Sequence, residues 1–165
     1  EDELFDYSPD YADMIAEKGI FVDPTLALSR LNQLRSVDGI GPASGAFAST
    51  DLRYEILRDM WDRGVKFVTG MDSGMTNANF DDFAYIPEVM VEDMGITPME
   101  AIISATQVSA DCLGLLDEIG TLEEGKAADV LIINGNPAVD IKALHDVNTI
   151  VKQGQIVKQE NELLI

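Results

Sequence analysis

The pattern of apolar and polar residues near the start of the chain predicts a helix, a glycine and a short strand. In SPDYADMIAEKGIFVDPTL, Ser8 is placed to cap a helix, and Pro9 occupies its first position, where a backbone N–H has no helical partner in any case. Gly19 follows the helical pattern, and residues 20–22 are all apolar. We therefore expect a helix that ends at the glycine and leads into a buried strand.

The same order recurs in TDLRYEILRDMWDRGVKFVTGMD. Thr50 is placed to cap the second helix, Gly64 to end it, and residues 65–69 to form the second strand. The apolar residues of this helix fall on one face: Leu52, Ile56, Leu57, Met60 and Trp61. Short, continuously apolar strands that alternate with helices favour parallel pairing, with the helices packed outside. The fold class is therefore predicted to be α/β.

Two further helices are predicted downstream. The first lies within residues 77–95, where Pro87 marks its first turn or a kink and Gly95 ends it. The second begins at TPME, in which Thr97, Pro98 and Glu100 form the signature of a capping box. Its apolar residues predict a stripe that faces the core: Met99, Ile102 and Ile103.

The last third of the chain has the pattern of a small β-element. Strand-like runs lie at residues 129–133, 149–152 and 155–158, and Gln153 with Gly154 is suited to a hairpin turn. The change of pattern at residues 115–120 predicts two parts, residues 1–118 and 119–165.

Composition narrows the classes of partner and compartment. The chain has 165 residues, of which 46% are hydrophobic, so it can bury a core. Its formal net charge of −19 would repel nucleic acid and anionic membranes, and we expect neither as a partner. No apolar run suggests a membrane span, and no leader is visible in a chain that begins at Glu1, so we expect a cytoplasmic protein whose native N-terminus is missing. The single cysteine, Cys112, lies in an apolar stretch and is expected to be buried.

Three titratable residues are candidates for chemistry. Asp72 ends the second predicted strand in VTGMDSGM, where Ser73 and Gly74 shape the loop; the residues alone favour a turn acid there over a catalytic acid. Asp23 ends the first strand before a proline and is interpreted as a turn residue rather than a catalytic one. His145, in KALHDVN, lies far along the chain from Asp72 and is expected to face solvent rather than bind metal.

Several strings occur in the order typical of a known family: EKGIFVDPTL, VTGMDSG, GITPMEAIISATQVSADCLGL, IGTLEEGKAADVLIINGNPAVDIKAL and IVKQGQIV. The chain resembles the C-terminal portion of the amidohydrolase superfamily, in its imidazolonepropionase-like and Xaa-Pro dipeptidase-like branch. The resemblance implies a distorted (β/α)8 TIM barrel with a small β-sandwich built from both chain ends. Residues 21–24 would then belong to barrel strand seven, residues 67–70 to strand eight, and those beyond 120 to the sandwich.

The resemblance also implies hydrolysis of carbon–nitrogen bonds in amides or dipeptides by a metal-activated water. These enzymes bind one or two divalent metals, often zinc, at the C-terminal mouth of the barrel. Asp72 matches the strand-eight aspartate, which is a metal ligand and proton shuttle. The remaining ligands of the family, which are an HxH pair, a lysine or similar bridging group and two histidines, cannot be assigned in this chain.

Size sets a further expectation, because a complete barrel takes about 250 residues and 165 cannot close one. We expect an inactive fragment without stoichiometric zinc that self-associates, docks with a missing N-terminal half, or is part of a longer polypeptide. Two other functions stay open: a non-catalytic binding or assembly module, and a deaminase acting on a nucleobase ring. In the parent enzyme, residues 36–50 and 75–83 are the candidate segments for contact with a small-molecule substrate.

Overall fold

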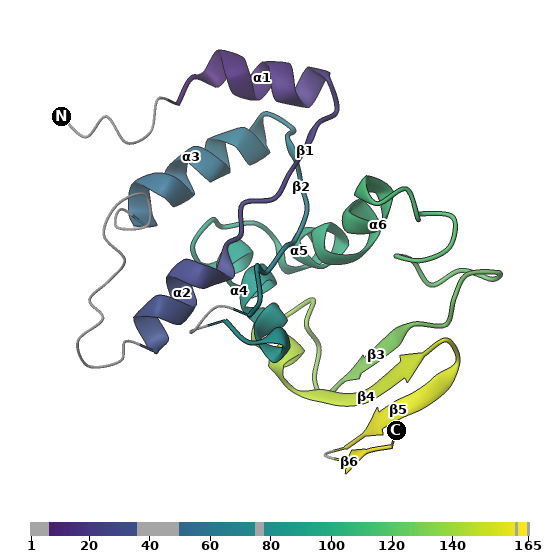
Figure 1. The fold of residues 1–165 in the computed structure, drawn as a ribbon. Helices are drawn as coiled ribbons and strands as arrows, with labels where there is room; N and C mark the ends of the chain where they lie inside the picture. The colour runs from purple at the N-terminus through teal and green to yellow at the C-terminus, as the bar shows by residue number, and fades with distance from the viewer. Residues whose placement is uncertain (1–6, 36–49, 75–77, 161, 165) are drawn as a thin grey trace. The chain divides into compact units, whose positions relative to one another are not determined.

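The computed structural model describes residues 7–35, 50–74, 78–160 and 162–164 (Figure 1). The chain divides into two compact units, Glu1–Ile96 and Thr97–Ile165, each of which is described by itself. The boundary that we predicted between residues 118 and 119 marks a change of pattern along the sequence and stays a prediction.

The centre of the first unit is a pair of parallel strands, as predicted. β1 (Phe21–Val22) pairs with β2 (Lys66–Phe67), with Phe21 opposite Lys66 and Val22 opposite Phe67. The pairing continues one residue beyond β2, where the N–H of Val68 donates to the carbonyl of Val22 at 2.9 Å. Phe67 is fully buried, and its ring meets that of Trp61 edge-on at a centroid distance of 5.8 Å. The strands are short, but they carry one of the largest buried side chains of the molecule.

Helices α1 (Pro9–Glu17) and α3 (Thr50–Asp62) precede the two strands and lie beside each other (Figure 1). The glycines predicted to end them, Gly19 and Gly64, have φ values of +63° and +87°. Such a conformation is easy for glycine and strained for other residues, so it explains where both helices stop. The predicted cap at Ser8 is wrong in one respect, because its side chain makes no capping hydrogen bond.

Helix α2 (Ala27–Leu34) was not predicted. It packs against α4 (Tyr85–Glu92), which follows a short 3-10 helix, η1 (Phe80–Ala84). Arg30 of α2 donates to Glu88 at 2.9 Å and also to the carboxylates of Glu92 and Asp93, so the two helices are joined by an ionic cluster. Pro87 lies in the first turn of α4, which is one of its two predicted places.

The second unit begins with α5 (Pro98–Ile103), a π-helical turn η2 (Ser104–Val108) and α6 (Ser109–Cys112). The capping box is confirmed, since Thr97 accepts the N–H of Glu100 while the Glu100 carboxylate accepts the N–H of Thr97. The predicted core stripe is wrong for Met99 and Ile103, which are exposed, whereas Ile102 is half-buried. The buried positions of these helices are small residues: Ala101, Ser104 and Ala110.

Cys112 is exposed, and the prediction of a buried cysteine is also wrong. It stands at the last position of α6, where the chain turns away from the helix at Leu113 and Gly114. The apolar stretch around Cys112 was the basis of the prediction, but Leu113 is exposed as well. At a helix end, position relative to the core decides burial more than the hydropathy of the neighbours does.

The rest of the second unit is an antiparallel sheet with the strand order β3-β4-β5-β6 (Figure 1). Its strands are β3 (Val130–Ile133), β4 (Val147–Lys152), β5 (Gln155–Gln159) and β6 (Glu162–Leu163), and a 3-10 helix, η3 (Ile141–His145), precedes β4. The first three strands were predicted, and the fourth was not. Gln153 and Gly154 both have positive φ, as a two-residue hairpin turn requires, so the predicted turn is confirmed. The α/β class is confirmed, and no helix among the described residues has the length and hydropathy to cross a membrane.

Candidate functional site

The predicted acid, Asp72, lies in the loop after β2, which ends at Phe67. Its backbone has a φ of +53°, which is uncommon for a residue other than glycine, and its side chain is exposed. The residues on either side are anchored: Met71 is buried, and the N–H of Gly74 donates to the carbonyl of Ala78 at 3.0 Å. The carboxylate of Asp72 therefore stands on a closed loop at the surface of its unit.

Asp23, at the end of β1, is a turn residue as predicted. Its Oδ1 accepts the N–H of Thr25 at 3.0 Å, closing a local turn. The same oxygen accepts the N–H of Gly70 at 3.1 Å, across 47 residues of sequence. The second bond was not foreseen, and it joins the ends of the two parallel strands two residues before Asp72.

Arg53 supports the same strand end from α3. Its guanidinium donates to the carbonyl of Pro24 and, at 3.1 Å, to Oγ of Ser29. Burial lowers the pKa of Arg53, which shows that this cation has been drawn partly out of water. Sequence analysis did not single out Arg53, because an arginine in a helix gives no local sign of a partner 29 residues away.

A second arginine, Arg35, contacts η1, which follows the loop that contains Asp72. Asp82 in η1 is buried, and both of its oxygens accept from the guanidinium of Arg35 at 2.5 Å. This hydrogen bonding raises the pKa of Arg35 above its ordinary value. Asp82 also accepts the N–H of Asn79, which begins η1. One residue further on, Phe80 is 85% exposed, so the bonds around Asp82 leave an aromatic ring in solvent beside the loop.

The structure describes most of the second predicted substrate segment, residues 75–83, but almost none of the first, residues 36–50. In the second segment, residues 75–77 lie outside the described residues, residues 78 and 79 precede η1, and residues 80–83 lie within it. The first segment, residues 36–50, lies outside the described residues except for Thr50, the first residue of α3.

The described residues do not by themselves form a metal centre. No cluster of three or more histidine, cysteine, aspartate or glutamate side chains among them is arranged to hold a metal ion. Asp72 offers a carboxylate of the kind that divalent metals bind, but a single carboxylate is not a complete donor set. His145 is exposed at the end of η3, as predicted for a solvent-facing side chain, and it belongs to the other unit. We therefore derive no chemical step through a metal from these residues.

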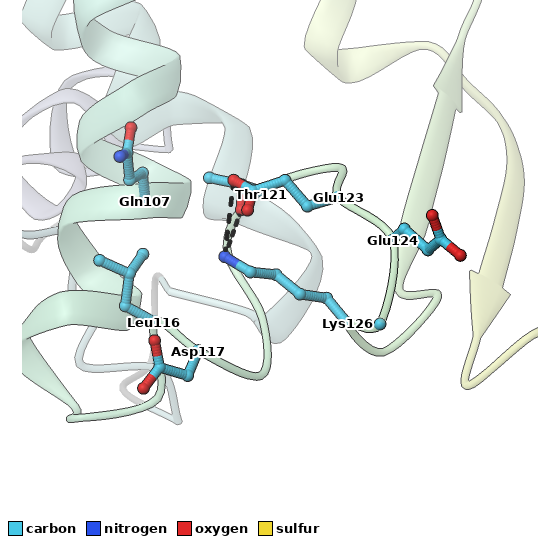
Figure 2. A pocket seen from close by; sticks show the side chains of 8 residues that line it. Gln107, Leu116, Asp117, Thr121, Glu123, Glu124 and Lys126 are labelled. Atoms are coloured by element: carbon cyan, nitrogen blue, oxygen red, sulfur yellow. Dashed lines mark hydrogen bonds and ion pairs between the residues drawn. The ribbon is translucent and has the colours of Figure 1, made fainter.

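A polar pocket of about 530 Å³ lies in the second unit (Figure 2). Its cation, Lys126, has a side chain only 11% exposed and donates to Oγ1 of Thr121 at 2.5 Å, with Glu123 at 3.7 Å. Figure 2 shows the ammonium group turned towards these two residues. Asp117 also lines the pocket. Lys126 thus fixes the loop that it belongs to, and we assign the pocket a structural role.

Curated proteins are similar to this chain over nearly its whole length. The imidazolonepropionase of Geobacillus kaustophilus (strain HTA426) is 30% identical over 163 residues, covering 93% of this chain and 38% of that protein. The 5-methylthioadenosine/S-adenosylhomocysteine deaminase of Caldanaerobacter subterraneus subsp. tengcongensis is 27% identical over 192 residues, covering 99% of this chain and 44% of that protein. The chain thus spans less than half the length of either relative.

Solved structures give the same result. A crystal structure of a Xaa-Pro dipeptidase with methionine bound in its active site superposes with a TM-score of 0.72 at 31% identity. The match covers 89% of this chain and 36% of that one, and such neighbours imply a fold of the TIM-barrel type. The model of the amidohydrolase family matches residues 3–157, which is nearly the whole sequence. The chain therefore belongs to the amidohydrolase family.

Proposed function

We propose that this chain supplies the strand-eight aspartate, Asp72, to the active site of a hydrolase that cleaves carbon–nitrogen bonds in amides or dipeptides. The observation that carries the proposal is the position of Asp72: an exposed carboxylate on a residue with positive φ, in the loop that follows one of two parallel strands. Catalytic groups of barrel enzymes lie at the C-terminal ends of such strands. In this proposal β1 and β2 are barrel strands seven and eight, and β3 to β6 belong to a β-sandwich.

Asp72 would act on protons. Its carboxylate would accept a proton from an attacking water and return it to the leaving nitrogen. The loop around it supports that role, because Met71 is buried and Gly74 is bonded to Ala78. In the complete site Asp72 would also offer one oxygen to a divalent metal, for which we propose zinc, and such a metal supplies Lewis acidity.

We propose that the chain alone is inactive and holds no stoichiometric zinc. The other donors must come from chain outside these residues, either a separate N-terminal half or further sequence of the same polypeptide, or from self-association. Metal analysis of the purified 165-residue chain checks this expectation. About one bound zinc per chain together with hydrolytic activity would overturn it.

The substitution Asp72→Asn tests the role of Asp72 in a catalytically complete protein, meaning one that also contains the remaining active-site groups. Removing the proton-accepting charge while keeping the shape should lower kcat by roughly 10²–10⁴-fold, with folding unchanged by circular dichroism. Asp140→Asn is the control, because Asp140 is also an exposed aspartate and lies in the other unit. Unchanged turnover in Asp72→Asn would contradict the assignment.

A second candidate function is deamination, since a relative named a deaminase matches 99% of this chain. The same aspartate would serve both reactions, so Asp72→Asn does not separate them. The two reactions are separated by assaying two activities on the same protein. One is ammonia release from aminopurine nucleosides, and the other is hydrolysis of Xaa-Pro dipeptides and cyclic amides. Turnover of the nucleosides alone would favour the deaminase over the amide hydrolase.

A further inference from the structure

The carboxylate of Asp23 is the link between the ends of β1 and β2. One oxygen accepts two backbone N–H groups, that of Thr25 in its own turn and that of Gly70 beyond β2. Bonds from backbone donors to an ionised carboxylate are stronger than those between neutral groups. Because Gly70 lies two residues before Asp72, the start of the Asp72 loop is tied to β1 through a single side chain.

Gly70 and Asp23 fit one another closely. A Cβ atom added at Gly70 would lie 1.7 Å from Oδ2 of Asp23, and the three atoms nearest to it all belong to that carboxyl group. The φ of Gly70 is not positive, so the backbone itself does not call for glycine there. The glycine is required by the approach of the Asp23 carboxylate. An alanine would displace the carboxylate and break its bond to the N–H of residue 70.

Strained backbone flanks the link on both sides. Thr25, two residues after Asp23, has a φ of +47°, and Asp72, two residues after Gly70, has a φ of +53°. A left-handed conformation is costly for a β-branched residue and uncommon for an aspartate. Such residues persist only where their surroundings hold them. The Asp23–Gly70 bond lies between Thr25 and Asp72 and is placed to stabilise the backbone conformation of both residues.

We propose that Asp23 is a positioning residue for Asp72, acting through Gly70 to orient the exposed carboxylate beyond β2. Its consequence for catalysis rests on the proposed function, whereas its effect on the backbone does not. Asp23 itself touches no reacting group in this proposal. Its role is to hold the end of β1 against the segment after β2, through the bond to Gly70.

The structural test is NMR of the 165-residue chain with Asp23→Ala, Gly70→Ala and the double variant. Either single change should speed hydrogen exchange of the residue 70 amide about tenfold and shift the Asp72 amide resonance. Both changes remove the bond to the N–H of residue 70, so the double variant should speed the exchange of that amide no more than either single change does. Asp140→Ala is the control, since Asp140 makes the same local bond, to Lys142, at 3.0 Å. Asp23→Asn keeps an acceptor oxygen and should restore most of the native signals.

The catalytic test uses the catalytically complete protein. Asp23→Ala and Gly70→Ala should each lower kcat by roughly tenfold to a hundredfold with little change in KM, and Asp23→Asn should recover much of the loss. If Asp72→Asn abolishes turnover while both variants keep the native kcat, or if the Asp72 resonance does not move in either, the positioning role is wrong. If Asp72→Asn leaves turnover intact, the proposed function fails instead, and the NMR result is unaffected.

Should Asp23→Ala fail to fold, Gly70→Ala decides the question alone. It keeps the Asp23 carboxylate in the chain as an acceptor for its local turn but displaces that carboxylate from the N–H of residue 70. Native exchange at residue 70 in a folded Gly70→Ala chain would overturn the proposal.

Discussion

Gly120 and Gly125 share a φ of +92° but differ in their surroundings. A Cβ at Gly120 would lie 2.5 Å from Cβ of Ala110 and 3.1 Å from the carbonyl oxygen of Thr106, whereas one at Gly125 would meet nothing within 4 Å. The first glycine lets the chain pass close to the helices of its unit. The second serves the turn conformation alone. Comparing a substitution at Gly120 with the same substitution at Gly125 therefore separates the cost of backbone strain from the cost of the steric contact.

We therefore predict that Gly120→Ala lowers the free energy of unfolding more than Gly125→Ala. Gly125→Ala, the control, should lower the free energy of unfolding by about 1–2 kcal/mol, because alanine is strained in the left-handed backbone that both positions share. Gly120→Ala should cost about 1–3 kcal/mol more, because the added methyl overpacks the contact with Ala110. Urea denaturation of both variants checks the difference. Equal losses would mean that the close contact at Gly120 relaxes freely.

Among the helices, two have similar residues at their start but different capping bonds in the structure. Both α1 and α5 have a hydroxyl residue before a proline. Thr97 accepts the N–H of Glu100 and completes a capping box, whereas Ser8 makes no side-chain cap bond. A hydroxyl residue before a proline is therefore not sufficient for the bond, and α1 has Tyr11 where α5 has Glu100.

Thr97→Ala should lower the free energy of unfolding by about 1 kcal/mol, because it leaves helical N–H groups without their acceptor. Ser8→Ala, at the equivalent position of α1, should change it by no more than a few tenths of that. Thermal denaturation followed by circular dichroism compares the two. A larger loss in the Ser8 variant would contradict the assignment of the caps.

The β4–β5 hairpin is anchored by Asp129. Lys152 donates to Oδ2 of Asp129, and the N–H of Gln153 donates to Oδ1 at 2.8 Å. These two bonds, that of Lys152 first, lower the pKa of Asp129 below its ordinary value of 3.8. A carboxylate with a depressed pKa in the folded state stabilises that state above the unfolded pKa. This stabilisation is lost as the pH falls through the folded value.

We predict that the Gln153 amide resonance titrates with a midpoint below 3.8, and that the hairpin loses stability as the pH falls through that midpoint. Lys152→Met should raise the midpoint, because it removes the larger of the two causes. Asp129→Asn should abolish the titration of the Gln153 amide. NMR between about pH 2 and 6 measures all three proteins. A midpoint that does not respond to Lys152→Met would contradict the ion pair.

For the molecule as a whole, the main feature is its large excess of negative charge. Asp and Glu number 30 against 11 Lys and Arg, which gives a formal net charge of −19 at pH 7. Part of this charge is locally paired, as in the cluster that Arg30 makes with Glu88, Glu92 and Asp93. The excess remains, and mutual repulsion among like charges opposes a compact state.

Salt should therefore raise the Tm of the chain at pH 7 between about 10 and 300 mM NaCl, because the Debye length falls from about 30 Å to below 8 Å. The same titration at about pH 5, closer to the sequence pI of 4.1, is the control and should show a smaller rise. Differential scanning calorimetry gives both. A Tm at pH 7 that falls with salt would mean that attractive pairs outweigh the repulsion.

The elements that could be predicted are those specified by residues close in sequence. Gly19 and Gly64 end their helices because a left-handed residue stops a helix wherever it occurs. Gln153 and Gly154 turn the hairpin for the same local reason. Helix α2 was missed because its N-cap, Leu26, has no side-chain cap bond and gives no start signal; its place depends on the burial of Leu26 and Leu31.

For the candidate site, the sequence was enough to show that an acid follows each parallel strand, Asp23 after β1 and Asp72 in the loop after β2, and to which family the chain belongs. Only the tertiary structure decided that Asp23 reaches Gly70 across 47 residues. It also decided that Asp82 is buried against Arg35 and that Met99 faces solvent. The physical reason is that caps and turns depend on backbone geometry within a few residues, whereas burial and cross-strand bonds depend on which distant segments the folded chain brings together.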